Sequence, residues 1–241
     1  MRLWQEKSGF PTQSGNLSDG HDAAAVPVAA ITVLQGLRDK GRIQKGERVL
    51  VDGASGGVGT FAVQIAKSFG AEVTAVCSTR NVDTARSIGA DHVIDYTRED
   101  FTRSGQRYDL ILGANAHHSI FDYRRALSPD GIYVVVGGGL ARIFQAMLLG
   151  PLLSLIGSKK TCFFIANINQ KDLVFLKELL EAGKVVPVID RRYPLSLCPN
   201  ARELFGRRRQ CLPNFAVTGE TEKSNAAPSG ACAPPFCSLC C

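Results

Sequence analysis

The sequence of 241 residues predicts an α/β fold, in which helices cover both faces of a parallel sheet. Short runs of Val, Ile and Leu alternate with segments whose apolar residues recur at helical spacing. Several of these runs lack polar alternation, which is typical of strands buried on both faces. The first run breaks into glycines and then into a helix, as in a nucleotide-binding turn. Six such strands predict a doubly wound Rossmann fold with a six-stranded parallel sheet.

The elements are expected in regular order along the chain. The first helix should lie within 23–40, beginning near Pro27 and ending at Gly41. Strands are expected at 48–52, 72–77, 92–95, 109–112, 132–136 and 162–165, and helices at 58–69, 82–88, 118–127, 140–156 and 170–182. Residues 185–189 should add a strand at a sheet edge or an exit from the sheet, because Pro187 cannot donate a ladder hydrogen bond.

The longest apolar stretch, 140–157, is interrupted by Arg142, Gln145 and Pro151. It is too short and too broken to span a bilayer, so no membrane span is expected. We expect a helix that is either buried or facing another subunit. A homodimer is therefore left open as an assembly.

The two ends of the chain differ from its middle. Residues 1–22 are expected to form an extended or disordered arm, 23–190 an NADP-binding Rossmann domain, and 191–241 an Arg- and Cys-rich tail without regular structure. Seven basic and three acidic residues in that tail account for +4 of the net charge of +6, so nucleic-acid binding by the folded part is not expected. Only Cys77 and Cys162 precede residue 198, in apolar runs that suit buried free thiols and a reducing cytoplasm.

Residues 53–59, Gly-Ala-Ser-Gly-Gly-Val-Gly, contain the strongest functional signal. Glycines allow backbone N–H groups to approach a pyrophosphate, and the helix N-terminus adds unpaired donors and a positive dipole end. The alternative is that the glycines serve packing alone. A P-loop is excluded, because Thr60 follows Gly59 directly and no lysine is present to hold a phosphate.

The end of the second strand indicates which dinucleotide is bound. An NAD site requires a carboxylate there for the ribose 2′-hydroxyl, but Ser78, Thr79, Arg80 and Asn81 follow this strand instead. Hydroxyls and a guanidinium suit a 2′-phosphate, so the sequence predicts NADPH rather than NADH. The alternative is that Arg80 merely begins a surface helix. The missing acid also weakens a methyltransferase interpretation.

Two other chemistries are disfavoured. A short-chain reductase needs Tyr and Lys four residues apart on one helix face, and none of the five tyrosines has a lysine at that spacing. His117 and His118 are adjacent, so they point in different directions and cannot readily share a metal ion. The Cys-x-x-Cys that ends at Cys240 has no second pair and no histidine near it. No metal site is expected.

Three motifs in order resemble the cofactor domain of the medium-chain dehydrogenase/reductases. They are the run from Ala24 to Thr32, the glycine turn, and Gly-Ala-Asp-His-Val-Ile-Asp-Tyr at 89–96. The form Ala-Ser-Gly-Gly-Val-Gly is similar to the zinc-independent quinone oxidoreductase branch, and the resemblance covers about 23–196. It implies hydride transfer from NADPH to a small-molecule carbonyl, enone or quinone. The alternative is a catalytically inactive dinucleotide-binding fragment that acts as a binding module.

The resemblance also implies cofactor-binding residues, although no catalytic ones. Ser55, Gly56, Gly57 and Val58 are expected on the pyrophosphate, Ser78 and Arg80 on the 2′-phosphate, Tyr96 near that phosphate or the adenine, Thr32 and Asn115 near the nicotinamide, and Gly137, Gly138, Ile165 and Asn167 along the nicotinamide ribose. Structural alternatives exist for three of these positions. Tyr96 can serve as a turn cap, Thr32 can satisfy helix backbone, and Gly137 to Gly139 can form a flexible loop.

Members of the family begin with a catalytic domain folded as a GroES-like β-barrel, which covers the nicotinamide. About 22 residues stand at that place in this chain, and the sequence departs from the family pattern again after Ser196. We therefore expect the N-terminal barrel to be largely missing, and with it half of the substrate pocket. Any reductase activity of this chain is expected to be impaired.

Overall fold

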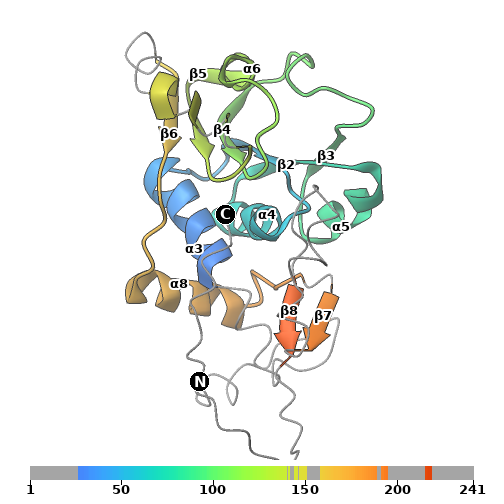
Figure 1. The fold of residues 1–241 in the computed structure, drawn as a ribbon, viewed down its shortest axis with the longest axis vertical. Helices are drawn as coiled ribbons and strands as arrows, with labels where there is room; N and C mark the ends of the chain where they lie inside the picture. Colours follow the sequence, from blue (N-terminus) through green and yellow to red (C-terminus); the bar gives the residue numbers. More distant parts are fainter. Residues whose placement is uncertain are drawn as a thin grey trace, which may run out of the picture.

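The computed structural model describes residues 27–139, 141, 144–145, 147–150, 158–188, 191–194 and 215–218. Six strands form one parallel sheet in the order β3-β2-β1-β4-β5-β6 (Figure 1). They are β1 (Arg48–Asp52), β2 (Glu72–Cys77), β3 (His92–Asp95), β4 (Tyr108–Gly113), β5 (Leu127–Val135) and β6 (Lys160–Phe163). The chain winds outward twice from β1, which is the strand order of a Rossmann fold. The predicted fold class is confirmed.

Helices connect the strands close to the predicted positions. They are α3 (Pro27–Gln35), which continues as the π-helix η2 (Gly36–Lys40), α4 (Gly57–Ser68), the 3₁₀ turn η3 (Thr79–Asn81), α5 (Val82–Ser87), α6 (Ile120–Ala126) and α8 (Gln170–Glu181). The helix predicted from residue 118 begins later, because Ser119 forms a capping box with Asp122. Among the described residues, no helix combines the length and the hydrophobicity needed to cross a membrane.

Two apolar cores cover the two faces of the sheet. In β1, Val49 and Val51 point into the larger core, which includes residues of α3, α4, α5 and α8. Leu50, between them, points into the smaller core with Phe101 and Tyr123 of α6. Because neighbouring residues of a strand face opposite sides, both sides of β1 must be apolar, and this explains its run without polar alternation.

Two predicted strands have the wrong bounds. The strand expected from 132 begins at Leu127 and contains a Ser-Pro-Asp-Gly turn sequence, which is accommodated by a register shift opposite β4. The strand expected at 162–165 ends at Phe163, so Ile165 lies beyond it.

The strand predicted at 185–189 is absent from its described part, 185–188. The backbone of Val186 instead pairs with a side-chain amide. Its N–H donates to Gln64 Oε1 at 2.7 Å, and its carbonyl accepts from Gln64 Nε2 at 2.9 Å. The amide takes the hydrogen-bonding groups that a neighbouring strand would have used, and Val185 beside it is buried.

The expected structureless tail contains a short parallel sheet of β7 (Arg191–Pro194) and β8 (Phe215–Thr218). The prediction is therefore wrong at these residues, where Phe-Ala-Val-Thr is a β-prone run. The predicted arm at 1–22 and the rest of the tail lie outside the described residues. In the helix predicted at 140–156, Phe144, Met147 and Leu148 are exposed, so the buried alternative is wrong there and the subunit-facing one stays a prediction.

Candidate dinucleotide-binding site

Most of the predicted site residues lie at one edge of the sheet, where its parallel strands end. We call this the carboxyl edge. The turn after β1 brings Ser55 to Val58 to it, β2 and β3 bring Ser78, Arg80 and Tyr96, and β4 and β5 bring Asn115, Gly137 and Gly138. The strand order reverses between β1 and β4, and open α/β sheets bind their ligands at such a switch point.

The glycines of the β1–α4 turn are required for different physical reasons. Gly53 has a φ of +84°, and a Cβ there would lie 2.6 Å from the Cβ of Asn115. A Cβ on Gly59 would lie 2.1 Å from the Gly53 carbonyl oxygen. Gly56 is different, because its φ is −83° and a Cβ would make only an ordinary contact, 3.6 Å from the Gly53 oxygen. Packing explains Gly53 and Gly59, whereas Gly56 leaves room at the edge.

Helix α4 begins at Gly57, immediately after this open position. Its N-cap, Gly56, has no side chain to bond to the first N–H groups, and the first turn contains no acidic residue. A helix leaves its first N–H groups without partners inside the helix, and its N-terminus is the positive end of the dipole. The turn therefore presents backbone donors to an anion.

The ends of β2 and β3 lie side by side at the carboxyl edge, because Cys77 pairs with Asp95. Ser78 follows β2, and Arg80 lies in η3. This turn leads into α5, so Arg80 stands at the start of a helix, as in the alternative to phosphate binding. Arg80 is exposed and forms no ion pair with a described residue. Tyr96 is 59% exposed, and its N–H donates to the Cys77 carbonyl at 3.1 Å. A basic and an aromatic side chain are thus available at this end of the edge.

The sequence interpretation missed Asp95, an acid at the end of β3 that bonds to Thr79, the residue between Ser78 and Arg80. Hydrogen bonding by the Thr79 hydroxyl lowers the pKa of Asp95, and Thr97 adds two further donors. The signal was present in the Ile-Asp-Tyr end of β3, but only the pairing of β3 with β2 shows that this carboxylate belongs to the site.

At the other end of the edge, the loops after β4 and β5 pack backbone against backbone. Asn115 and Ala114 donate their N–H groups to the Asp52 carbonyl at 3.2 and 2.9 Å. A Cβ on Gly137 would lie 2.4 Å from the Ala114 oxygen, and Gly138, with φ +138°, forms a bridge with Ala116. Packing accounts for Gly137, and packing together with a positive φ accounts for Gly138.

A buried pair that the sequence did not reveal lies beneath this loop. The Tyr123 hydroxyl donates a hydrogen bond to the Asp52 carboxyl group, and the His117 N–H donates to the Tyr123 oxygen at 3.2 Å. Burial raises the pKa of Asp52 and that of Tyr123. The Tyr123 ring also stacks on Tyr133, with centroids 4.3 Å apart. The pair therefore fixes the loop after β4 to the end of β1.

His117 and His118 precede α6, and the His118 ring packs edge-on against Phe101, with centroids 5.1 Å apart. Within the described ranges, no three His, Cys, Asp or Glu side chains are grouped so that they could hold a metal ion.

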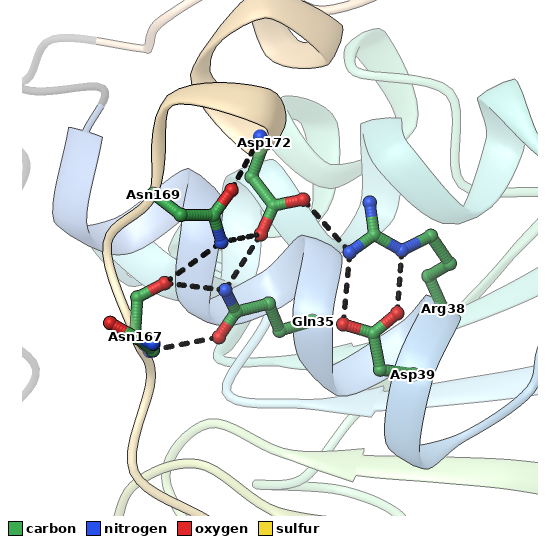
Figure 2. Close-up of polar contacts among 6 residues, drawn as sticks. All are labelled: Gln35, Arg38, Asp39, Asn167, Asn169 and Asp172. Atoms are coloured by element: carbon green, nitrogen blue, oxygen red, sulfur yellow. Dashed lines mark hydrogen bonds and ion pairs between the residues drawn. The ribbon is translucent and has the colours of Figure 1, made fainter.

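The segment after β6 is held by side chains rather than by a sheet (Figure 2). Gln35 of α3 donates to the Asn167 carbonyl at 2.6 Å and accepts from the Asn167 N–H at 3.0 Å. Gln35 also donates to Asp172 at 2.7 Å, and Asp172 pairs with Arg38 at 2.8 Å. Desolvation raises the pKa of Asp172, but hydrogen bonds from Gln35, Asn169 and Arg38 outweigh it, so the net pKa is lowered.

The remaining predicted residues lie on or near this segment. Asn167 and Ile165 are exposed, Ile165 at 85%, so they stand beyond the strand rather than closing it. Thr32 donates its hydroxyl to the Val28 carbonyl at 2.8 Å, which satisfies helix backbone as the structural alternative proposed.

Comparisons with known proteins agree with this geometry. A model of the zinc-binding dehydrogenase family matches residues 88–211, more than half of the chain. The chain belongs to this family of the medium-chain dehydrogenase/reductases. A chloroplast envelope quinone oxidoreductase homolog of Arabidopsis thaliana is 34% identical over 190 residues, which cover 75% of this chain and 56% of the relative. A mitochondrial NAD(P)H oxidoreductase of Mus musculus is 34% identical over 203 residues, which cover 74% and 51%.

Among solved structures, the quinone oxidoreductase from Coxiella burnetii matches with a TM-score of 0.68 and 25% identity, over 82% of this chain and 60% of that chain. These relatives place this member of the medium-chain dehydrogenase/reductases in the quinone-oxidoreductase-like branch, as the glycine turn predicted. The chain spans about half the length of the curated relatives it matches, 51–56% for the two named above.

Proposed function

We propose that this chain binds a nicotinamide dinucleotide at the carboxyl edge, with NADPH preferred to NADH. Gly56 is the observation on which the proposal depends. It needs neither a positive φ nor a close packing contact, and a Cβ there would make only an ordinary contact with the Gly53 oxygen. In a doubly wound fold this is where the backbone approaches the pyrophosphate. Ser55, Gly57 and Val58 are proposed to contact the same group.

The preference for NADPH is proposed from the ends of β2 and β3. Arg80 is exposed and without an ion pair among the described residues, so its guanidinium can form charge-assisted bonds to a 2′-phosphate. Ser78 is proposed to donate to the same phosphate, and Tyr96 to lie against it or the adenine. The nicotinamide half is proposed to lie along Thr32, Asn115, Gly137, Gly138, Ile165 and Asn167.

The proposed reaction is reduction of a small-molecule carbonyl, enone or quinone. The nicotinamide supplies the hydride in this chemistry, and the task of this chain's residues is to bind and orient the dinucleotide. Relatives named as quinone oxidoreductases support this reaction class. Residues 23–190 are proposed to form the cofactor domain.

The proposed location and assembly depend on separate observations. Cys77 and Cys162 are free thiols, which supports a cytoplasmic location. The exposed Phe144, Met147 and Leu148 support a homodimer.

Calorimetric titration with NADPH tests the proposal directly. The parent chain should bind NADPH, and Gly56→Ala should weaken binding at least about tenfold, because a methyl group takes the space of the phosphate, an effect of about 1.4 kcal/mol. The thermal unfolding of Gly56→Ala should match that of the parent. A quinone is then added, and oxidation of NADPH is followed by its absorbance. Binding without oxidation indicates a binding module, and absence of NADPH binding contradicts the cofactor assignment.

A further inference from the structure

A carboxylate lies at the part of the carboxyl edge where the 2′-phosphate is proposed to bind. It does not come from the strand that usually supplies an acid there. Sites for NADH have an acid at the end of the second strand, and this acid accepts a hydrogen bond from the ribose 2′-hydroxyl. Here β2 ends without an acid, but Asp95 at the end of β3 is level with Cys77, the last residue of β2. An acid therefore lies one strand away from the usual place.

Both oxygens of this carboxylate already accept hydrogen bonds. Thr79 donates its hydroxyl proton to Asp95 Oδ2 at 2.5 Å. Thr97 donates its N–H and its hydroxyl to Oδ1 at 3.0 and 2.7 Å. Among the described residues, only Thr79 donates to Oδ2. These bonds lower the pKa of Asp95, with a smaller contribution from the charge of Arg98, so the group is an ionised acceptor at neutral pH.

The two hydroxyls that follow β2 consequently differ in polarity. A hydroxyl group has one proton, and Thr79 gives its proton to Asp95. Ser78 Oγ instead accepts from Asn81 Nδ2 at 3.1 Å, and no described residue accepts the Ser78 proton. Ser78 can therefore donate to a ligand, whereas Thr79 cannot do so without releasing Asp95.

We propose that Thr79 determines dinucleotide specificity, by holding the Asp95 carboxylate away from the 2′ position. The inference rests on the proposed dinucleotide function. While Oδ2 is held, the groups offered to the 2′ position are donors, the Ser78 hydroxyl and the Arg80 guanidinium, which suit a phosphate. Without the Thr79 hydroxyl, Oδ2 becomes an unpaired acceptor, which suits a free 2′-hydroxyl and repels a phosphate.

The variant Thr79→Val in the full chain tests this role, because it removes the hydroxyl with little change in volume. Dissociation constants for NADPH and NADH are measured by calorimetry, and the preference is Kd for NADH divided by Kd for NADPH. The preference should fall at least about tenfold, the equivalent of about 1.4 kcal/mol, as NADPH binding weakens and NADH binding strengthens. Thr79→Ala should shift it in the same direction, so the test does not depend on one variant folding.

Two controls separate this role from a general structural one. Ser78→Ala should weaken NADPH binding about fivefold and leave NADH binding unchanged, because only the phosphate uses that donor. In Thr79→Val combined with Asp95→Asn, the preference should return to that of Asp95→Asn alone, because no carboxylate is left to uncover.

A preference in Thr79→Val within about twofold of the parent value would overturn the inference, since a structural role weakens both dinucleotides alike. A fall that persists in the double variant would overturn it as well. If the parent binds neither dinucleotide, the proposed function itself fails.

Discussion

At the β1–α4 turn the backbone makes the close contacts, and the Gly53 carbonyl oxygen stands 2.1 Å from where a Cβ of Gly59 would be. At one end of the carboxyl edge, the segment after β6 is held by side chains. Gln35 forms a two-bond pair with the Asn167 backbone and a third bond to Asp172 (Figure 2). The β1–α4 turn tolerates only glycine at positions 53 and 59. The segment after β6 instead needs a side chain with one hydrogen-bond donor and one acceptor, placed to meet the Asn167 backbone.

A second glutamine uses the same device. Gln64 of α4 pairs with both the N–H and the carbonyl of Val186, just as Gln35 does with Asn167. Both glutamines are buried, at 6–7% exposure. A carboxamide has the same donor and acceptor as a peptide group, so it can satisfy backbone that no strand pairs. Two side-chain clamps therefore satisfy backbone groups at Asn167 and Val186.

The largest expected effect breaks the glycine turn. Gly59→Ala should destabilise the chain by about 3 kcal/mol or more, because the new methyl group collides with backbone that cannot move aside. Gly56→Ala is the matched control, and it should change stability by less than about 1 kcal/mol. Urea unfolding of both variants decides the point. Equal losses of stability would mean that the two glycines share one role.

A smaller effect is expected at the Gln35 clamp. Gln35→Met keeps the length of the side chain but leaves the Asn167 N–H without its partner. It also removes one of the two donors to the Asn167 carbonyl and to Asp172 Oδ2, which keep Asn169, at a total cost of about 2 kcal/mol. Urea unfolding measures the loss. Gln44→Met is the control, since Gln44 is exposed, and its cost should stay below about 0.5 kcal/mol. A Gln35→Met variant as stable as that control would show that the clamp does not stabilise the fold.

The smallest effect concerns Asp52, the last residue of β1 before the glycine turn. Because burial raises its pKa in the folded chain, its contribution to stability is complete below the unfolded pKa and falls as pH rises toward the folded pKa. Asp52→Asn does not titrate, so it should gain stability relative to the parent, on the order of 1 kcal/mol, between about pH 4 and neutral pH. Unfolding curves across that range provide the measurement.

Asp91 supplies a control of opposite sign. Desolvation raises its pKa, but bonds from Lys67 and the Val73 N–H outweigh this and lower it, so its contribution is lost as pH falls. Asp91→Asn should therefore be less stable than the parent at neutral pH, and the difference should shrink in acid. Parallel pH profiles for the Asp52 and Asp91 variants would contradict the assigned environments.

The six strands and their helices were predictable because their signals are local. Helical spacing, apolar runs and glycine punctuation depend on residues next to one another, so they identified β1 to β4 within a residue. Boundaries failed where distant groups intervened. The run at 185–188 has the composition of a strand, but Gln64 takes its hydrogen bonds from 122 residues away.

For the candidate site, three features could be predicted from the sequence: the glycine turn, the absence of an acid after β2, and the positions of Ser78 and Arg80 at a strand end. The fold was needed to show that Gly56 makes no close contact while Gly53 and Gly59 are packed. The fold also showed that Asp95, at the end of β3, bonds to Thr79, which follows the neighbouring strand β2. A residue type states what a side chain can bond, but the partner is whichever group packing brings within about 3 Å.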